Sequence, residues 1–130
     1  MTSHILAAFA DIFQPISFAF LFVGSALGLL VGVLPGLSSP MALAILIPIT
    51  FGMEPFSAFM ILIGIYVGTK TGGAFAAILI RTPGTPAAAA TAMEGFPMAQ
   101  RGEAGRALAI SIGSSFLGGT VSWMVAVPLV

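Results

Sequence analysis

Long apolar runs, separated by short clusters of proline, glycine and hydroxyl residues, make up most of this 130-residue chain. Every position in residues 16–34 is apolar or small, and about 20 such residues cross the hydrocarbon core of a membrane as a helix. Residues 56–80 and 108–130 are two further long runs. Residues 41–51 would reach only about 16 Å as a helix, which is roughly half a bilayer. The pattern predicts an all-α, multi-pass membrane protein with broken helices or re-entrant hairpins.

Two clusters of similar composition interrupt the apolar runs. The sequence PGLSSP occupies residues 35–40, and RTPGTP occupies residues 81–86. Proline removes a backbone donor and glycine tolerates positive φ, so each cluster is expected to break a helix. Gly72-Gly73 predicts a third break, inside residues 56–80. A further short helix is expected over residues 87–93.

The predicted breaks are candidate substrate sites, because broken membrane helices persist only where protein, water or a ligand satisfies the freed backbone groups. A helix that restarts after a break presents free N–H groups and the positive end of its dipole, which suits a carboxylate. Hydroxyl groups lie beside both restarts, including that of Thr82. We expect the breaks at residues 35–40 and 83–86 to meet near the membrane midplane and bind a carboxylate there, because neither would be tolerated facing lipid. The candidate binding residues are Pro35, Gly36, Ser38, Ser39, Gly72, Gly73, Pro83, Gly84 and Thr85.

Glycines at four-residue spacing clear one face of each of two predicted helices, and this spacing allows helices to approach at backbone distance. One ladder is Gly24, Gly28 and Gly32, and the other is Gly64, Gly68 and Gly72. We assign these residues to helix packing and expect the two helices to pack face to face.

Charge and composition exclude several classes of function. Only 6% of the residues are charged, with four acids balancing four cations, so nucleic acid is not an expected partner. The chain has no cysteine and a single histidine. Its residues show neither the pattern of a serine–histidine–aspartate triad nor the spacing of a metal-ligand set. We therefore expect neither an enzyme nor a metal site.

The cations Lys70 and Arg81 lie in apolar sequence, where a charge normally pairs or extends to the membrane surface. Two interpretations stay open for each: a cation that marks the end of a span, or a charge partner for the substrate. Residues 94–106 form the only plainly hydrophilic connection, and Arg101 and Arg106 predict that it faces the cytoplasm. Residues 1–14 are expected to form a short interfacial helix and not a cleavable signal.

The linked motifs, in order, resemble a known transporter family. They are GVLPGLSSPMALAILIPITFGMEP, GIYVGTKTGGAFAAILIRTPGTPAAAATAMEGFPMAQRGEAGRALAI and SFLGGT. Together they are similar to the large membrane subunit of the tripartite tricarboxylate transporters, the TctA family. In that family's pattern, the positions of Lys70 and Arg81 are usually uncharged.

The resemblance implies a secondary transporter in the bacterial inner membrane, driven by an ion gradient. It would work with a small membrane subunit and a periplasmic solute-binding protein that delivers carboxylates. Na⁺ or H⁺ would be the coupling ion, and no organic cofactor is expected. Members are several times longer, so residues 1–130 would be the N-terminal portion of one transport domain. The alternatives are a packing or scaffold subunit that carries no substrate, and a small channel.

Overall fold

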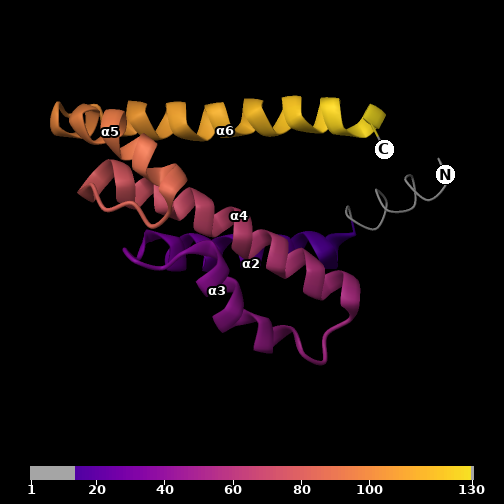
Figure 1. Ribbon diagram of the computed structural model, residues 1–130. Helices are drawn as coiled ribbons and strands as arrows, with labels where there is room; N and C mark the ends of the chain where they lie inside the picture. The colour runs from indigo at the N-terminus through magenta and orange to yellow at the C-terminus, as the bar shows by residue number, and fades with distance from the viewer. Residues whose placement is uncertain (1–13, 130) are drawn as a thin grey trace.

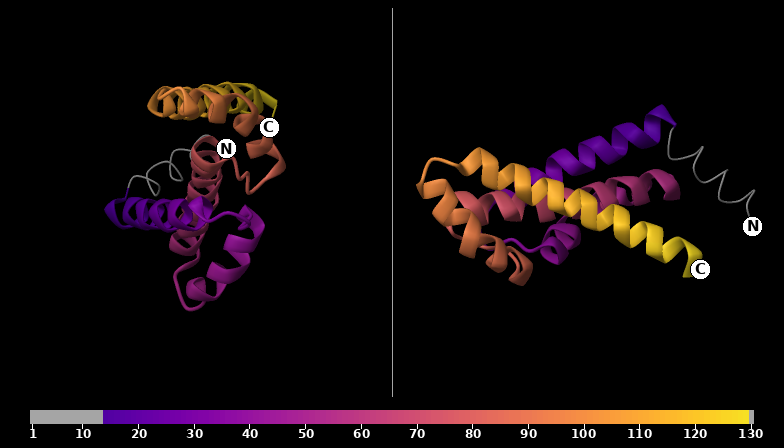
Figure 2. Two further views of the ribbon diagram at one scale, coloured as in Figure 1. Left: turned by 90° about the vertical axis from the view of Figure 1, so that its left-hand side faces the viewer. Right: turned by 90° about the horizontal axis from the view of Figure 1, so that it is seen from above.

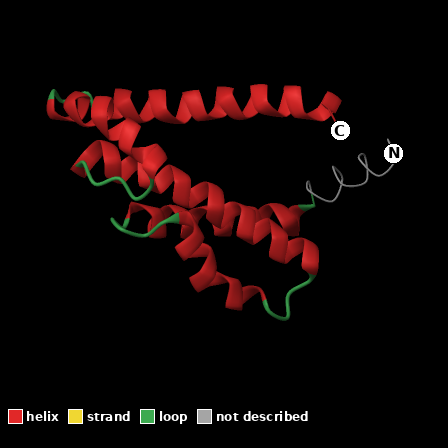
Figure 3. Ribbon diagram, viewed as in Figure 1, coloured by secondary structure: helices red, strands yellow, loops and turns green. Residues whose placement is uncertain are grey.

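The computed structural model describes residues 14–129, and every regular element in that range is a helix (Figures 1 and 3). The all-α prediction is therefore confirmed for the described residues. Apart from Gln14, the interfacial helix expected over residues 1–14 lies outside them. The elements are α2 (Pro15–Val33), α3 (Ser39–Leu46), η1 (Ile47–Thr50), α4 (Pro55–Ile80), α5 (Pro86–Gln100), α6 (Ala104–Ala126) and η2 (Val127–Leu129).

Proline begins three of these helices, at Pro15, Pro55 and Pro86. The first N–H groups of a helix have no partner within it, so the donor that proline lacks costs nothing there. At the start of α4, the carboxylate of Glu54 accepts a 2.9 Å hydrogen bond from the Ser57 N–H. Hydrogen bonds from the backbone of Phe56 and Ser57 lower the pKa of Glu54. This acid is thus a helix cap at the surface.

The two glycine ladders interlock in the contact between α2 and α4, which confirms that the two helices pack face to face. Gly24, Gly28 and Gly32 lie in turn against the backbone of Ile61, Ile65 and Thr69. Both numbers increase together along the contact, so the two helices run parallel. In the other direction, a Cβ placed on Gly64 would lie 2.5 Å from the carbonyl oxygen of Leu21. No larger residue fits these positions without separating the helices.

The prediction of a break at Gly72-Gly73 is wrong, because α4 is one continuous helix of 26 residues. Glycine keeps the N–H that proline lacks, so both residues remain in the helical hydrogen-bond pattern. Their cost in helix propensity, about 1 kcal/mol each, is offset by the close packing that Gly72 allows against α2.

The short apolar segment expected over residues 41–51 is observed as helix over residues 39–50, as α3 followed by η1. The α-helix ends at Leu46 and the chain tightens to a 3₁₀-helix that contains Pro48. Proline cannot donate to the carbonyl four residues earlier, which accounts for the change. Ala42 of α3 packs on Ile61 and Ile65, so the segment returns along the N-terminal half of α4.

The hydrophilic connection is much shorter than residues 94–106, and the short helix expected over residues 87–93 is longer. Helix α5 continues to Gln100, with Pro97 inside it, and only residues 101–103 connect it to α6. Polar side chains at a membrane surface do not end a helix. Gly95 has a packing role, because a Cβ there would lie 2.6 Å from the Ile78 side chain.

Helix α6 begins at Ala104 and ends at Ala126, so it starts four residues before the predicted 108–130 span. It crosses over α4 (Figure 2), and Ala107 is its one buried residue in the described chain. Helices α2, α4 and α6 are long and apolar enough to cross a membrane. These three helices are the candidate membrane spans of the described residues.

Candidate functional site

The breaks predicted at residues 35–40 and 81–86 are observed as loops over residues 34–38 and 81–85, and the two loops lie side by side. A Cβ built on Gly84 would be 3.2 Å from the carbonyl oxygen of Leu37. Figure 1 shows both loops at the left-hand end of the molecule, where the α5–α6 connection also lies. The chain brings together two helix ends, those of α2 and α4, and two helix starts, those of α3 and α5. These two breaks were expected to meet, and residues 37 and 84 do lie against each other.

The meeting point lies along the C-terminal part of α4. Gly32, next to the end of α2, is level with Thr69. Helix α4 continues from there to Ile80, which is a further distance of about 16 Å at 1.5 Å per residue. The first break therefore begins alongside α4 and not beyond its end.

The first break is shaped by Gly36, whose φ of 91° only glycine adopts readily. Ser38 is the N-cap of α3, and its side chain makes no capping hydrogen bond. The hydroxyl oxygen of Ser39 is buried and has no hydrogen-bond partner, and the residue is 0% exposed. A buried polar atom without a partner is destabilising, so this hydroxyl calls for a functional or structural explanation.

The second break begins at Arg81, which caps α4 in the left-handed conformation with φ 55°. The N–H groups of Arg81 and Thr82 both reach back to the carbonyl of Ala76. Thr85 is the N-cap of α5, and its hydroxyl oxygen accepts a 3.2 Å hydrogen bond from the Ala88 N–H. Its own proton is still available to donate. Pro83 is exposed and Gly84 is half-buried.

Gly72 and Gly73, which were expected in the same site, lie within α4. Gly72 packs against α2, and a Cβ on Gly73 would meet nothing within 4 Å. Neither residue contributes a break, and only Gly72 has a packing contact with α2.

The two cations within the apolar sequence have different surroundings. Arg81 follows the last residue of α4, so this cation lies at a helix end, as expected of a cation that marks the end of a span. Its guanidinium carbon lies 5.7 Å from the centre of the Phe96 ring. The ammonium nitrogen of Lys70 lies 5.4 Å from the centre of the Tyr66 ring, in the middle of α4.

Two cavities lie where α6 meets α4 and α5. Nothing in the sequence indicated them. One, of about 220 Å³, lies between α4 and α6 and includes Lys70, Thr71, Ser111 and Ser115. The other, of about 210 Å³, includes Glu94, Ser111 and Ser114. The serines at 111, 114 and 115 are visible in the sequence, but only the crossing of α6 over α4 places two of them near a cation. Within residues 14–129, no cluster of three or more metal-ligating side chains was found.

Residues 18–130 match the Tripartite tricarboxylate transporter TctA family. The chain belongs to this family. It is also 41% identical, over 125 residues, to the "Uncharacterized 52.8 kDa protein in TAR-I ttuC' 3'region" of Agrobacterium vitis. That alignment covers 96% of the TctA chain described here but 25% of the relative. No solved structure matches the chain.

Family membership confirms the resemblance drawn from the motifs. TctA proteins are a transporter family and are named for a tripartite system, which agrees with a membrane protein that assembles with other subunits. The breaks at residues 34–38 and 81–85 lie inside the matched region.

Proposed function

We propose that this chain is part of the membrane subunit of a secondary transporter that imports carboxylates across the bacterial inner membrane. An ion gradient of Na⁺ or H⁺ would drive uptake. A periplasmic solute-binding protein would deliver the substrate, and a small membrane subunit would complete the assembly. Membership of a family named for tripartite tricarboxylate transport supports the proposal. The chain spans 25% of the curated relative it matches, so the activity is that of a longer protein.

The observation that carries the site is the buried, unpartnered hydroxyl of Ser39 at a place where two breaks meet. Each break is followed by a helix whose first N–H groups point back towards the break. Two helix starts close together supply donors and positive dipole ends without any formal charge. This is the arrangement that discontinuous transporter helices use for anionic substrate groups.

Donors and acceptors at the junction fit both a carboxylate and its coupling ion. Ser38, Ser39 and Thr85 supply hydroxyl groups that can donate to a carboxylate. The carbonyl of Leu37 faces Gly84, and carbonyls freed at helix ends are typical ligands of Na⁺ in transporters. Ser39 is closed to solvent, so substrate access would require the two breaks to separate.

Replacement of Ser39 by alanine tests the site in the full-length transporter with its partner subunits. Loss of one hydrogen bond to a charged group costs about 1.5–3 kcal/mol, so apparent affinity should fall roughly 10- to 150-fold. Folding should not suffer, because Ser39→Ala removes a buried hydroxyl that has no partner. We therefore expect weaker uptake together with equal or higher thermal stability.

The matched control is Ser25→Ala in α2, where the hydroxyl donates a 2.8 Å hydrogen bond to the Leu21 carbonyl of its own helix. This variant should leave uptake unchanged. Normal uptake by Ser39→Ala, with membrane levels equal to the parent, would contradict the site. It would then favour a scaffold role for this part of the chain.

A further inference from the structure

We propose that the cavity between α4 and α6 binds a small carboxylate through the ammonium group of Lys70. This site is separate from the junction of the two breaks. The cavity has a volume of about 220 Å³ and combines one cation with the hydroxyl-bearing residues Tyr66, Thr71, Ser111 and Ser115. Its remaining lining is apolar, and this combination is typical of small-ligand sites.

Lys70 lies in the interior of α4. It lies ten residues before the helix ends at Ile80 and fifteen after it begins at Pro55. These intervals are about 15 Å and 22 Å at 1.5 Å per residue, so Lys70 lies inside the apolar helix and not at either of its ends. An ionisable group inside an apolar span faces a partner or a water-filled cavity, and such a group marks a substrate or ion pathway.

No carboxylate of the described residues forms an ion pair with Lys70. Across residues 14–129, the ion pair found is Arg106 with Glu103, and no carboxylate lies within 4 Å of the Lys70 ammonium. Glu94 lines the adjoining cavity, which shares Ser111 with this one. The Lys70 ammonium lies over the Tyr66 ring. A cation–π contact of this kind attracts the ammonium but does not neutralise its charge.

Lys70 lies on a different face of α4 from the glycines that pack on α2. The glycines of α4 that pack on α2 are at positions 64, 68 and 72, whereas the cavity is lined by Tyr66, Val67 and Lys70. Packing with α2 therefore leaves this face to α6. The exposed side chain of Lys70 can turn towards a ligand without disturbing the α2–α4 contact.

Charge-selective labelling tests the site in the full-length transporter after removal of any cysteine outside residues 1–130. In Ser115→Cys, the thiol would replace a hydroxyl that lines the cavity. The probes are an anionic sulfonatoethyl and a cationic trimethylammonioethyl methanethiosulfonate, with rates normalised to a free thiol. A focused cation raises the local concentration of anions, so the anionic reagent should react about tenfold faster. This preference should vanish in Lys70→Gln and persist in Lys70→Arg.

Ser114→Cys is the matched control, because the neighbouring residue lines the cavity that contains Glu94. It should show no anionic preference and no response to Lys70→Gln. A second arm measures protection of Ser115→Cys by acetate, succinate and citrate. Protection by at least one of them is expected if the anion is a free carboxylate.

Three outcomes would overturn the proposal. In the first, the thiol at position 115 is unreactive. In the second, the anionic preference survives Lys70→Gln. In the third, none of the three acids protects the thiol. The first and last would indicate that Lys70 pairs with an acidic side chain from another part of the transporter. Because the cavity is distinct from the junction, these results do not depend on the outcome for Ser39→Ala.

Discussion

The carbonyl oxygen of Leu29 in α2 lies 2.5 Å from where a Cβ at Gly72 of α4 would be. At the next position, Gly73, a Cβ would meet nothing within 4 Å. Two neighbouring glycines in one helix therefore have opposite packing environments. The pair separates the effect of close helix contact from that of glycine's low helix propensity.

We predict that Gly72→Ala and Gly73→Ala change stability in opposite directions. Alanine at position 72 would force the backbones of α2 and α4 apart, at a cost of about 1–3 kcal/mol or more. Alanine at position 73 has room and should stabilise α4 by about 0.5–1 kcal/mol through its helix propensity. Thermal unfolding of the two purified variants in the same detergent measures the difference. Equal melting temperatures would show that α2 and α4 do not pack through this ladder.

The helix packing and the two proline-containing breaks could be predicted from the sequence because each depends on local chemistry. A proline removes a donor wherever it stands, and glycine spacing defines a helix face. The prediction of a break at Gly72-Gly73 was wrong because glycine is found both where two helices pack closely and where a helix breaks. Only the neighbouring α2 decides between them.

The candidate site was predictable in outline. The hydroxyls at positions 38, 39 and 85 follow from the sequence, and the meeting of the two breaks was expected because neither would be tolerated facing lipid. The particular contact between Leu37 and Gly84 depends on how α3 and α5 leave the ends of α2 and α4. The Lys70 cavity depends in the same way on the crossing of α6. Long-range pairings of this kind leave no periodic signal in a single sequence.

Variants of Arg81 test whether its backbone conformation or its charge matters at the second break. Its left-handed conformation, with φ 55°, costs a non-glycine residue about 1–2 kcal/mol. Arg81→Gly removes this cost and the contact with Phe96, whereas Arg81→Ala removes the contact alone. We expect the glycine variant to be more stable than the alanine variant by about 1–2 kcal/mol, as measured by thermal unfolding. Equal stabilities would contradict the left-handed cap.

Uptake by Arg81→Gly then addresses the charge itself. If the cation only ends α4 and stacks on Phe96, transport by the full-length protein should be close to that of the parent. A large loss of uptake with unchanged stability would instead make Arg81 a charge partner for the substrate.

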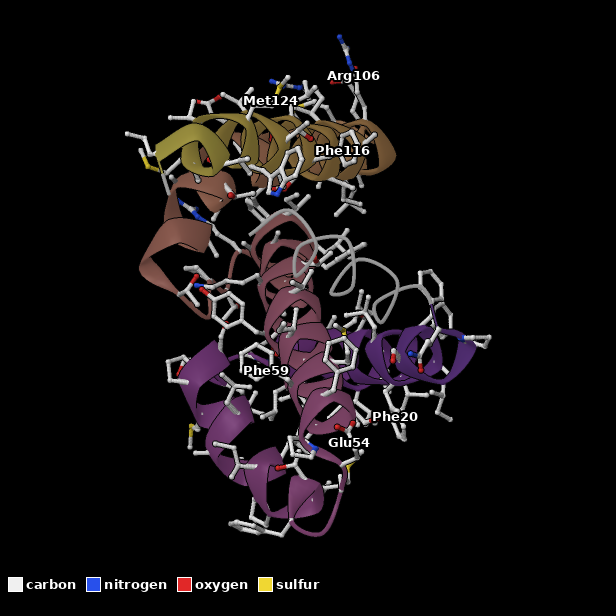
Figure 4. All side chains as sticks on the ribbon, turned by 90° about the vertical axis from the view of Figure 1, so that its right-hand side faces the viewer. Phe20, Glu54, Phe59, Arg106, Phe116 and Met124 are labelled. Atoms are coloured by element: carbon white, nitrogen blue, oxygen red, sulfur yellow. The ribbon has the colours of Figure 1, made fainter. Side chains whose placement is uncertain are left out.

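The distribution of charge between the two ends of the bundle predicts its orientation in the membrane. Arg81 ends α4, Arg101 lies in the α5–α6 connection, and Arg106 points away from the other helices (Figure 4). All three lie at the end where the breaks meet. At the opposite end the charged residue described is Glu54. Since positive residues favour the cytoplasmic side, the α5–α6 connection and both breaks should face the cytoplasm.

Paired cysteine variants of the full-length transporter, otherwise free of cysteine, measure this orientation in cells with a permeable outer membrane. Gln100→Cys lies at the end of α5, and Phe51→Cys is an exposed position at the Glu54 end. An impermeant maleimide should label position 51 in intact cells and position 100 only after the inner membrane is opened. Because both positions belong to one packed bundle, the two results must agree with each other. Labelling of position 100 but not of position 51 in intact cells would indicate the opposite orientation, in which the junction of the breaks faces the periplasm.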